Sequence, residues 1–128
     1  MFLESPFFGI GPGQFRNFCN DDRYYYNKLG CSTHPHNSYM QVLSELGVVG
    51  FIFIFGAFFY VLISLIFQLK KMSDRNLINI KDFRSCLLIS FTLSLWPILP
   101  TQDFFNNWIN IIYYLPVGFY LHLLHKKN

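Results

Sequence analysis

The sequence predicts an all-α integral membrane protein with three transmembrane helices and an external N-terminal segment that contains short helices. The chain is 52% hydrophobic and only 13% charged, whereas an ordinary globular domain has about 25% charged residues. The apolar residues are concentrated in three runs that follow residue 46. Lysine and arginine are concentrated between the first two runs and after the third, as in the cytoplasmic loops of membrane proteins.

The first apolar run, Gly47–Leu69, has 23 residues and no charged side chain. At 1.5 Å per residue it is about 35 Å of helix, enough to cross a hydrocarbon core of ~30 Å with some tilt. The two later runs are shorter and contain proline, which a span tolerates where neighbouring helices satisfy the freed backbone groups. The predicted spans are 47–69, 83–99 and 108–124, in a spanning region 47–128 that follows an external segment 1–46.

The charges between the spans predict the orientation. The segment 70–84 contains five Lys or Arg residues and the tail contains a Lys pair, whereas the connection 100–107 contains neither residue type. This bias places 70–84 and the C-terminus in the cytoplasm and residues 1–46 and 100–107 outside, which is the periplasm in a bacterium with two membranes. Because no signal peptide or earlier span precedes the external segment, we expect the chain to be the C-terminal part of a longer membrane protein. The alternative is a small three-span protein with a translocated N-terminus.

The cysteines show no metal-ligand spacing. Cys19 and Cys31 could pair in an external segment, and two free thiols are the alternative. No basic run with interleaved aromatics suggests a nucleic-acid partner. The tyrosine-rich segment 21–30 could stack on sugar rings or form an interfacial aromatic belt.

A glycine-rich segment, residues 9–18, precedes the tyrosine-rich segment. Its glycines at positions 9, 11 and 13 permit positive φ and close backbone approach, but their spacing is neither that of a P-loop nor that of a Rossmann fingerprint. A turn that lays aromatic side chains on the membrane surface is an alternative interpretation. Arg16 could bind a pyrophosphate through paired hydrogen bonds, or it could anchor the segment at the interface.

A histidine segment leads into the first span. Ser38 with Gln41 fits a capping box, which predicts a helix that begins near Ser38. His36 then lies just before a helix N-terminus. The positive end of the helix dipole disfavours the protonated form of its imidazole and attracts anions such as phosphate. A neutral imidazole there can act as a general base. His34 and His36 could instead bind a metal, although no third ligand is evident, or His36 could merely cap the helix. Glu45 is either a second polar group of the site or the last polar residue before the membrane.

These residues resemble a known signature. His36-Asn37, nine residues, then Gly47-Val48-Val49-Gly50 is similar to the pattern H-[NSR]-x9-G-x-x-[GTY] of the O-antigen ligase family and matches it completely. The glycine-rich segment 9–15, the basic loop and the external loop around 100–106 are also similar to the C-terminal part of this superfamily.

The resemblance implies a metal-independent, inverting glycosyltransferase of the membrane-embedded, multi-span GT-C type, without a cofactor. Such enzymes transfer a glycan from undecaprenyl pyrophosphate, at the periplasmic face of the bacterial inner membrane, to an acceptor hydroxyl. In ligases the acceptor is lipid A–core. The resemblance assigns the catalytic base to His36, pyrophosphate binding to Arg16 and a structural role to Gly47 and Gly50. The further candidates for substrate binding are His34, Asn37, Ser38 and Glu45.

Three alternatives stay open at this point. O-antigen or exopolysaccharide polymerases and protein O-oligosaccharyltransferases share this histidine region and differ in the acceptor. A small non-catalytic membrane protein is the alternative from another class. Because the family's arginines in earlier external loops are absent, we expect the isolated chain to show no glycan transfer.

Overall fold

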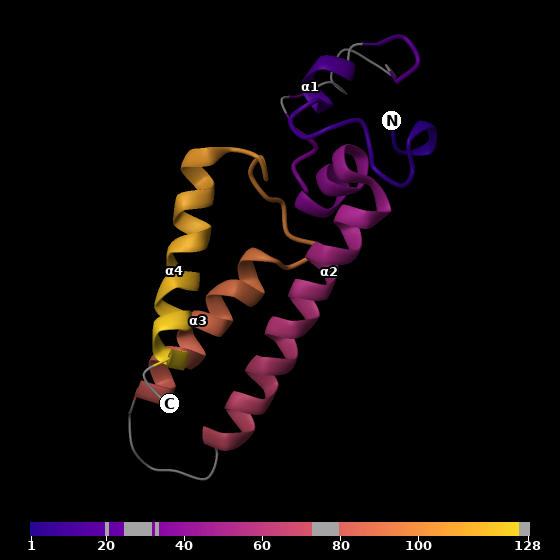
Figure 1. Cartoon of the computed structure of the whole chain (residues 1–128). Coiled ribbons are helices and arrows are strands. Elements are labelled where there is room, and N and C mark those ends of the chain that lie inside the picture. Colours follow the sequence, from indigo (N-terminus) through magenta and orange to yellow (C-terminus); the bar gives the residue numbers. More distant parts are fainter. Residues whose placement is uncertain (20, 25–31, 33, 73–79, 126–128) are drawn as a thin grey trace. The chain divides into compact units, whose positions relative to one another are not determined.

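The computed structural model describes residues 1–19, 21–24, 32, 34–72 and 80–125. Every regular element in these residues is a helix, which confirms the all-α prediction (Figure 1). The elements are a 3-10 turn η1 (Phe2–Glu4), α1 (Phe15–Phe18), α2 (Ser38–Met72), α3 (Ile80–Ser94) and α4 (Asn107–His125).

The chain divides into two compact units. The first unit comprises residues 1–55 and 97–109 and contains the predicted site. The second comprises residues 56–96 and 110–128. The functional division expected from the sequence, an external segment 1–46 and a spanning region 47–128, stays a prediction.

Helix α2 has the properties of a membrane span. Within its segment Ser38–Lys70, an 18-residue window has a mean hydropathy of 2.6, and only 17% of that window is buried within the protein. A core helix of a soluble protein would bury most of that surface. Because this surface is apolar and left uncovered, α2 is suited to lipid, and it contains the predicted span 47–69.

The other two predicted spans are helical but do not pass the same test. Of the described helices, only α2 is both long and apolar enough to cross a membrane, so three spans stay a proposal. Helix α4 closely matches the predicted 108–124, with Pro116 inside it. Helix α3 ends at Ser94, so the prediction of a helix to residue 99 was wrong. The reason is Pro97, which disfavours a helical conformation for the residue before it.

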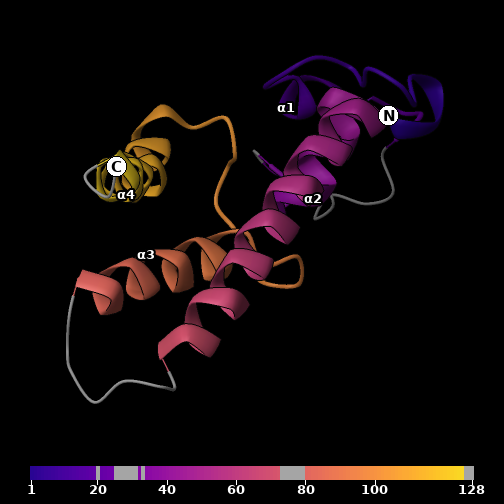
Figure 2. The ribbon, with the colours of Figure 1, turned by 60° about the horizontal axis from the view of Figure 1, so that its bottom comes forward.

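The second unit contains parts of α2, α3 and α4 (Figure 2). Side chains from these three helices form a small apolar core. Leu88 of α3 is its most buried member, at 1% exposure. The core cluster comprises Leu65 of α2, Leu87, Leu88 and Phe91 of α3, and Tyr120 of α4. Beside it, the Arg84 guanidinium lies over the Tyr120 ring, 5.2 Å from its centroid, and donates to the Tyr120 hydroxyl at 3.2 Å.

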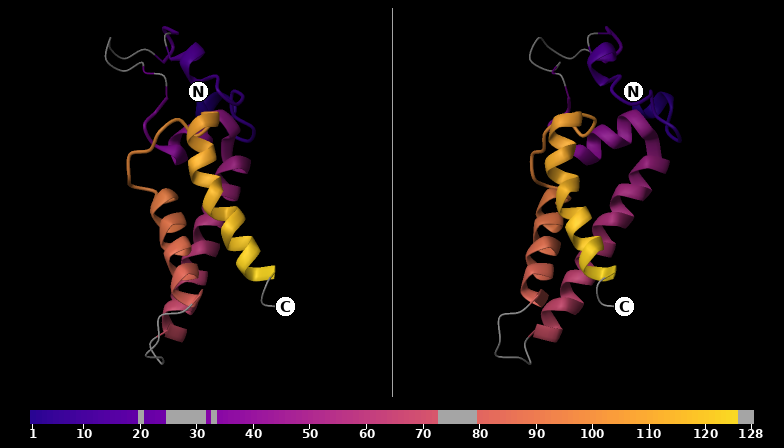
Figure 3. Two further views of the ribbon diagram at one scale, coloured as in Figure 1. Left: turned by 90° about the vertical axis from the view of Figure 1, so that its left-hand side faces the viewer. Right: turned by 60° about the vertical axis from the view of Figure 1, so that its left-hand side comes forward.

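In the first unit α2 is broken at Gly47, whose φ of 66° and ψ of −163° are not helical (Figure 3). A break frees backbone donors and acceptors that a helix would otherwise pair, and these groups need other partners away from water. The N-terminal segment supplies the partners through four backbone hydrogen bonds. They join Ile10 N–H to Ser44 O, Gly11 N–H to Glu45 O, Val48 N–H to Pro6 O and Val49 N–H to Phe7 O, at 3.1, 2.9, 2.8 and 3.3 Å.

Two glycines make this close backbone contact possible. A Cβ on Gly47 would lie 2.4 Å from the carbonyl carbon of Phe7, and a Cβ on Gly9 would lie 2.3 Å from that of Glu45. Both glycines also have positive φ, which other residues rarely adopt. The break in α2 and the path of the glycine-rich segment therefore depend on each other.

Candidate active site

His36 lies two residues before the start of α2, and its side chain is exposed. Its φ of 54° is positive, which is uncommon for a residue other than glycine. The His36 ring contacts the ring of the buried His34, with centroids 4.3 Å apart and planes inclined by 58°. An exposed imidazole on a fixed backbone can accept a proton from a group that approaches from outside the protein.

Asn37 caps the helix that follows. Its Oδ1 accepts the N–H groups of Tyr39 and Met40 at 3.0 and 3.1 Å, the pattern of an N-cap residue. Its Nδ2 donates to the carbonyl of Pro97 at 2.8 Å. The predicted helix start near Ser38 is confirmed, but the Ser38–Gln41 capping box was wrong because Asn37 already supplies the cap.

Ser38 and Gln41 instead contact the connection between α3 and α4, residues 97–104. The Ser38 hydroxyl lies 2.8 Å from the Thr101 hydroxyl. Gln41, only 2% exposed, donates through Nε2 to Asp103 Oδ1 at 2.6 Å and accepts the Phe104 N–H through Oε1 at 2.9 Å. Thr101, Gln41 and Asp103 were not among the predicted site residues. One signal was present, since polar residues recur at helical spacing at positions 37, 41 and 45.

Glu45 is completely buried, at 0% exposure. Its two carboxylate oxygens accept the Gly13 N–H at 2.9 Å and the Phe15 N–H at 2.7 Å. A buried carboxylate requires such donors because desolvation of a charge is costly. Glu45 therefore holds the glycine-rich segment against α2, and Gly13, at φ 70°, is one of its two anchor points.

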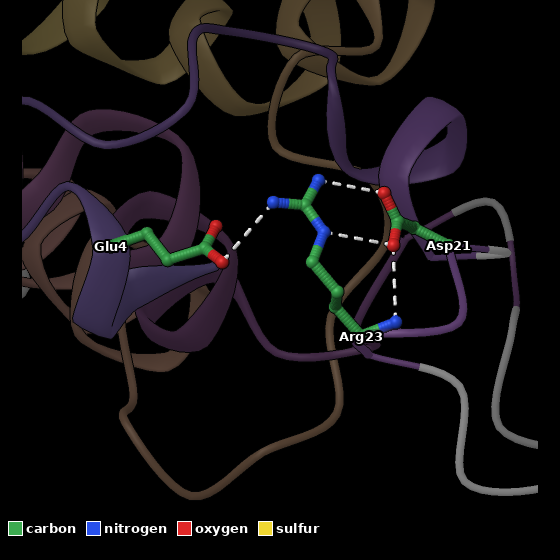
Figure 4. A network of polar contacts seen from close by, with 3 residues as sticks. All are labelled: Glu4, Asp21 and Arg23. Carbon is green, nitrogen blue, oxygen red and sulfur yellow. Dashed lines mark hydrogen bonds and ion pairs between the residues drawn. The ribbon is translucent and has the colours of Figure 1, made fainter.

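The two described arginines of this segment differ in their surroundings. Arg23 pairs with Asp21 at 2.7 Å and with Glu4 at 3.4 Å (Figure 4). The hydrogen bonds to Arg23 lower the pKa of the Asp21 carboxyl to about 2, and the pair raises the pKa of Arg23. Arg16 is exposed on α1, and the described residues give its guanidinium no hydrogen bond or ion pair. Arg16 is thus the arginine available to an anionic ligand.

The remaining candidates divide as follows. Within the described part of the chain, no three His, Cys, Asp or Glu side chains form a group that could hold a metal ion. Cys31 and most of the tyrosine-rich segment 21–30 lie outside the described residues, so the predicted pairing with Cys19 and the role in sugar stacking stay predictions.

Gly50, the last position of the signature, follows the break at Gly47. A Cβ on Gly50 would lie 2.4 Å from the Cβ of Leu46 and 3.2 Å from a methyl carbon of Val42. Glycine at position 50 thus leaves room for side chains on the other side of the break. The two glycines of the signature therefore have a common structural role, which is to permit the break in α2.

Comparison with known proteins gives a family match over part of the chain. No curated protein and no solved structure matches the chain. The family model described as O-antigen ligase matches residues 1–55, which include the glycine-rich segment, His36, Asn37 and both signature glycines. The resemblance inferred from the signature is therefore confirmed over residues 1–55, where the chain is similar to the O-antigen ligase family.

Proposed function

We propose that this chain provides the catalytic base of an O-antigen ligase-like glycosyltransferase. The enzyme transfers a glycan from undecaprenyl pyrophosphate to a hydroxyl of lipid A–core, with inversion at the anomeric carbon. The observation that carries the proposal is the family match over residues 1–55, in which His36 presents an exposed imidazole at the start of α2. The match itself supports a ligase-like or polymerase-like transferase, and the substrates are our inference.

In the proposed reaction His36 accepts the proton of the acceptor hydroxyl as its oxygen attacks the anomeric carbon. The bond between that carbon and the pyrophosphate oxygen breaks on the opposite face, and the pyrophosphate leaves with the electron pair. Its negative charge requires a cationic partner, and our candidate is Arg16, whose exposed guanidinium has no ion pair among the described residues. Attack from the face opposite the leaving group accounts for inversion.

The proposed location is the bacterial inner membrane, with residues 1–46 on the periplasmic side and the C-terminus in the cytoplasm. The long apolar α2 supports a membrane location. The side on which each segment lies rests on the distribution of lysine and arginine. The three-span arrangement rests on the two shorter helices α3 and α4, and a lipid-linked substrate would reach the site from the membrane surface.

His36→Ala in the protein as it is made in the cell tests the proposal. Because positioned general bases typically contribute about 10²–10⁴-fold in rate, we expect glycan transfer to fall at least about 100-fold at a normal protein level. The matched control is His122→Ala, which removes an exposed histidine on α4 in the other unit. Transfer is measured as glycan joined to acceptor in membranes supplied with the lipid-linked donor.

The product identifies the acceptor. Glycan on lipid A–core supports a ligase, a lengthened lipid-linked glycan indicates a polymerase, and glycosylated protein indicates an oligosaccharyltransferase. Unchanged transfer in His36→Ala would contradict the proposed base and favour a non-catalytic role for this histidine.

A further inference from the structure

We infer that the connection 97–104 positions His36, with Gln41 and Asp103 as its anchor. The inference rests on the proposed function, because it gives His36 the role of base. It adds Thr101 and Asp103, from a part of the chain outside the family match, and Gln41, which occupies a position that the signature leaves unspecified. They act through His36 and are positioning residues.

The backbone of His36 has a positive φ of 54°. Left-handed φ in a residue with a Cβ is strained and persists only where the surroundings enforce it. At His36 the surroundings are the connection, because Thr101 N–H donates to the His36 carbonyl at 2.9 Å. The next residue, Asn37, donates to the Pro97 carbonyl at 2.8 Å. The connection thus binds the chain at His36 and directly after it.

Gln41 and Asp103 form the anchor of the connection. Both ends of the buried Gln41 amide bond to the connection, one as donor to Asp103 and one as acceptor from Phe104. Asp103 Oδ1 also accepts the Phe105 N–H at 3.0 Å, which fixes the carboxylate within its own turn. Buried polar groups with all their partners in place define a single arrangement, and loss of one partner leaves the others unsatisfied.

The hydroxyls of Ser38 and Thr101 form a further contact with the connection. Ser38 is 8% exposed, and its hydroxyl lies against that of Thr101, whose backbone N–H binds the His36 carbonyl. Thr101 therefore contacts the chain on both sides of the helix cap. The side chain of His36, by contrast, stays exposed. This combination fixes the backbone and leaves the imidazole accessible, which is what a base that meets an external substrate requires.

The experiment compares Asp103→Ala with Asp103→Asn and with Gln102→Ala. Asparagine keeps an oxygen acceptor for Gln41, and Gln102 is an exposed residue of the same connection. Two quantities are measured: kcat and KM of glycan transfer, and the rate at which diethyl pyrocarbonate modifies His36, followed by mass spectrometry. The second quantity requires no transfer activity.

We expect Asp103→Ala to lower kcat about tenfold or more with KM for the lipid-linked donor changed less than twofold. We expect the modification rate of His36 to change at least threefold. Asp103→Asn should restore both quantities to within about twofold of the unaltered protein, and Gln102→Ala should leave them unchanged. If Asp103→Ala does not accumulate, Thr101→Val replaces it, because valine removes only the hydroxyl and keeps the backbone N–H.

An unchanged modification rate in Asp103→Ala, or in Thr101→Val where that variant replaces it, overturns the inference. So does normal transfer in that variant when His36→Ala is inactive. If the modification rate changes but no variant, His36→Ala included, affects transfer, the positioning of His36 stands and the proposed function fails. The two proposals are therefore refuted by different results.

Discussion

Glu45 provides the most direct test of how the glycine-rich segment is held. In Glu45→Ala both carboxylate oxygens are lost, and the N–H groups of Gly13 and Phe15, at 2.9 and 2.7 Å, lose their acceptors. A hydrogen bond to a charged group contributes about 1.5–3 kcal/mol, so two contribute about 3–6 kcal/mol. The alanine no longer buries a charge, which offsets part of this loss. We therefore expect the free energy of opening of the segment to fall by about 3 kcal/mol.

Amide hydrogen exchange measures this opening free energy at the affected groups. A fall of about 3 kcal/mol corresponds to about 150-fold faster exchange, since 1.36 kcal/mol is tenfold. We expect this increase at the Gly13 and Phe15 amides. The Gly11 amide, which donates to the main-chain oxygen of Glu45 that alanine retains, should change less.

Two further variants test whether the Glu45 carboxylate holds the glycine-rich segment. Glu45→Gln keeps one acceptor oxygen and replaces the other with an amide donor, so we expect exchange between that of Glu45→Ala and that of the unaltered protein. Glu4→Gln changes an exposed carboxylate of the same segment and should leave the Gly13 and Phe15 amides unaffected. If Glu45→Ala left the protection of these two amides unchanged, the carboxylate would not be what holds the segment.

Two other predictions follow from the first unit. Gly47→Ala introduces a Cβ at 2.4 Å from the Phe7 backbone, at a residue whose φ is 66°. We therefore expect thermal unfolding in detergent to show a destabilisation of about 3 kcal/mol or more. The control Gly56→Ala, which has open space at its Cβ, should be neutral or slightly stabilising. Arg23→Gln should raise the pKa of Asp21 from about 2 toward about 3.9, as read by NMR titration. Because the folded pKa is the lower one, the pair's contribution is present above about pH 4 and is lost as the pH falls through 2; equal titration curves in both proteins would refute the pairing.

The helices were largely predictable, because long apolar runs leave few other conformations in a membrane. The boundary of α3 was not. Residues up to Leu99 are apolar, and apolarity alone extended the prediction past Ser94. The helix ends earlier because of the backbone restriction that Pro97 imposes, a local effect that outweighs the hydropathy of the run.

At the site, the sequence predicted where the helix begins but not how its polar residues are used. Asn37 and Ser38 both belong to the residue types that favour N-caps, so local chemistry did not distinguish them. The choice depends on tertiary contacts. Ser38 and Gln41 bond to residues 63 and 62 positions away, and no pattern within one helix reveals such partners.

The signature and the loops therefore specify different properties of the site. His36 and Asn37 mark the helix start, and Gly47 and Gly50 permit its break, so the fifteen positions from His36 to Gly50 define a short helical segment detached from the long span. The residues that hold the two ends of that segment lie outside the signature. Residues 9–15 hold one end through Glu45, and residues 97–104 hold the other through Gln41 and the His36 carbonyl. The backbone position that we infer for His36 therefore depends on three segments that are distant in sequence.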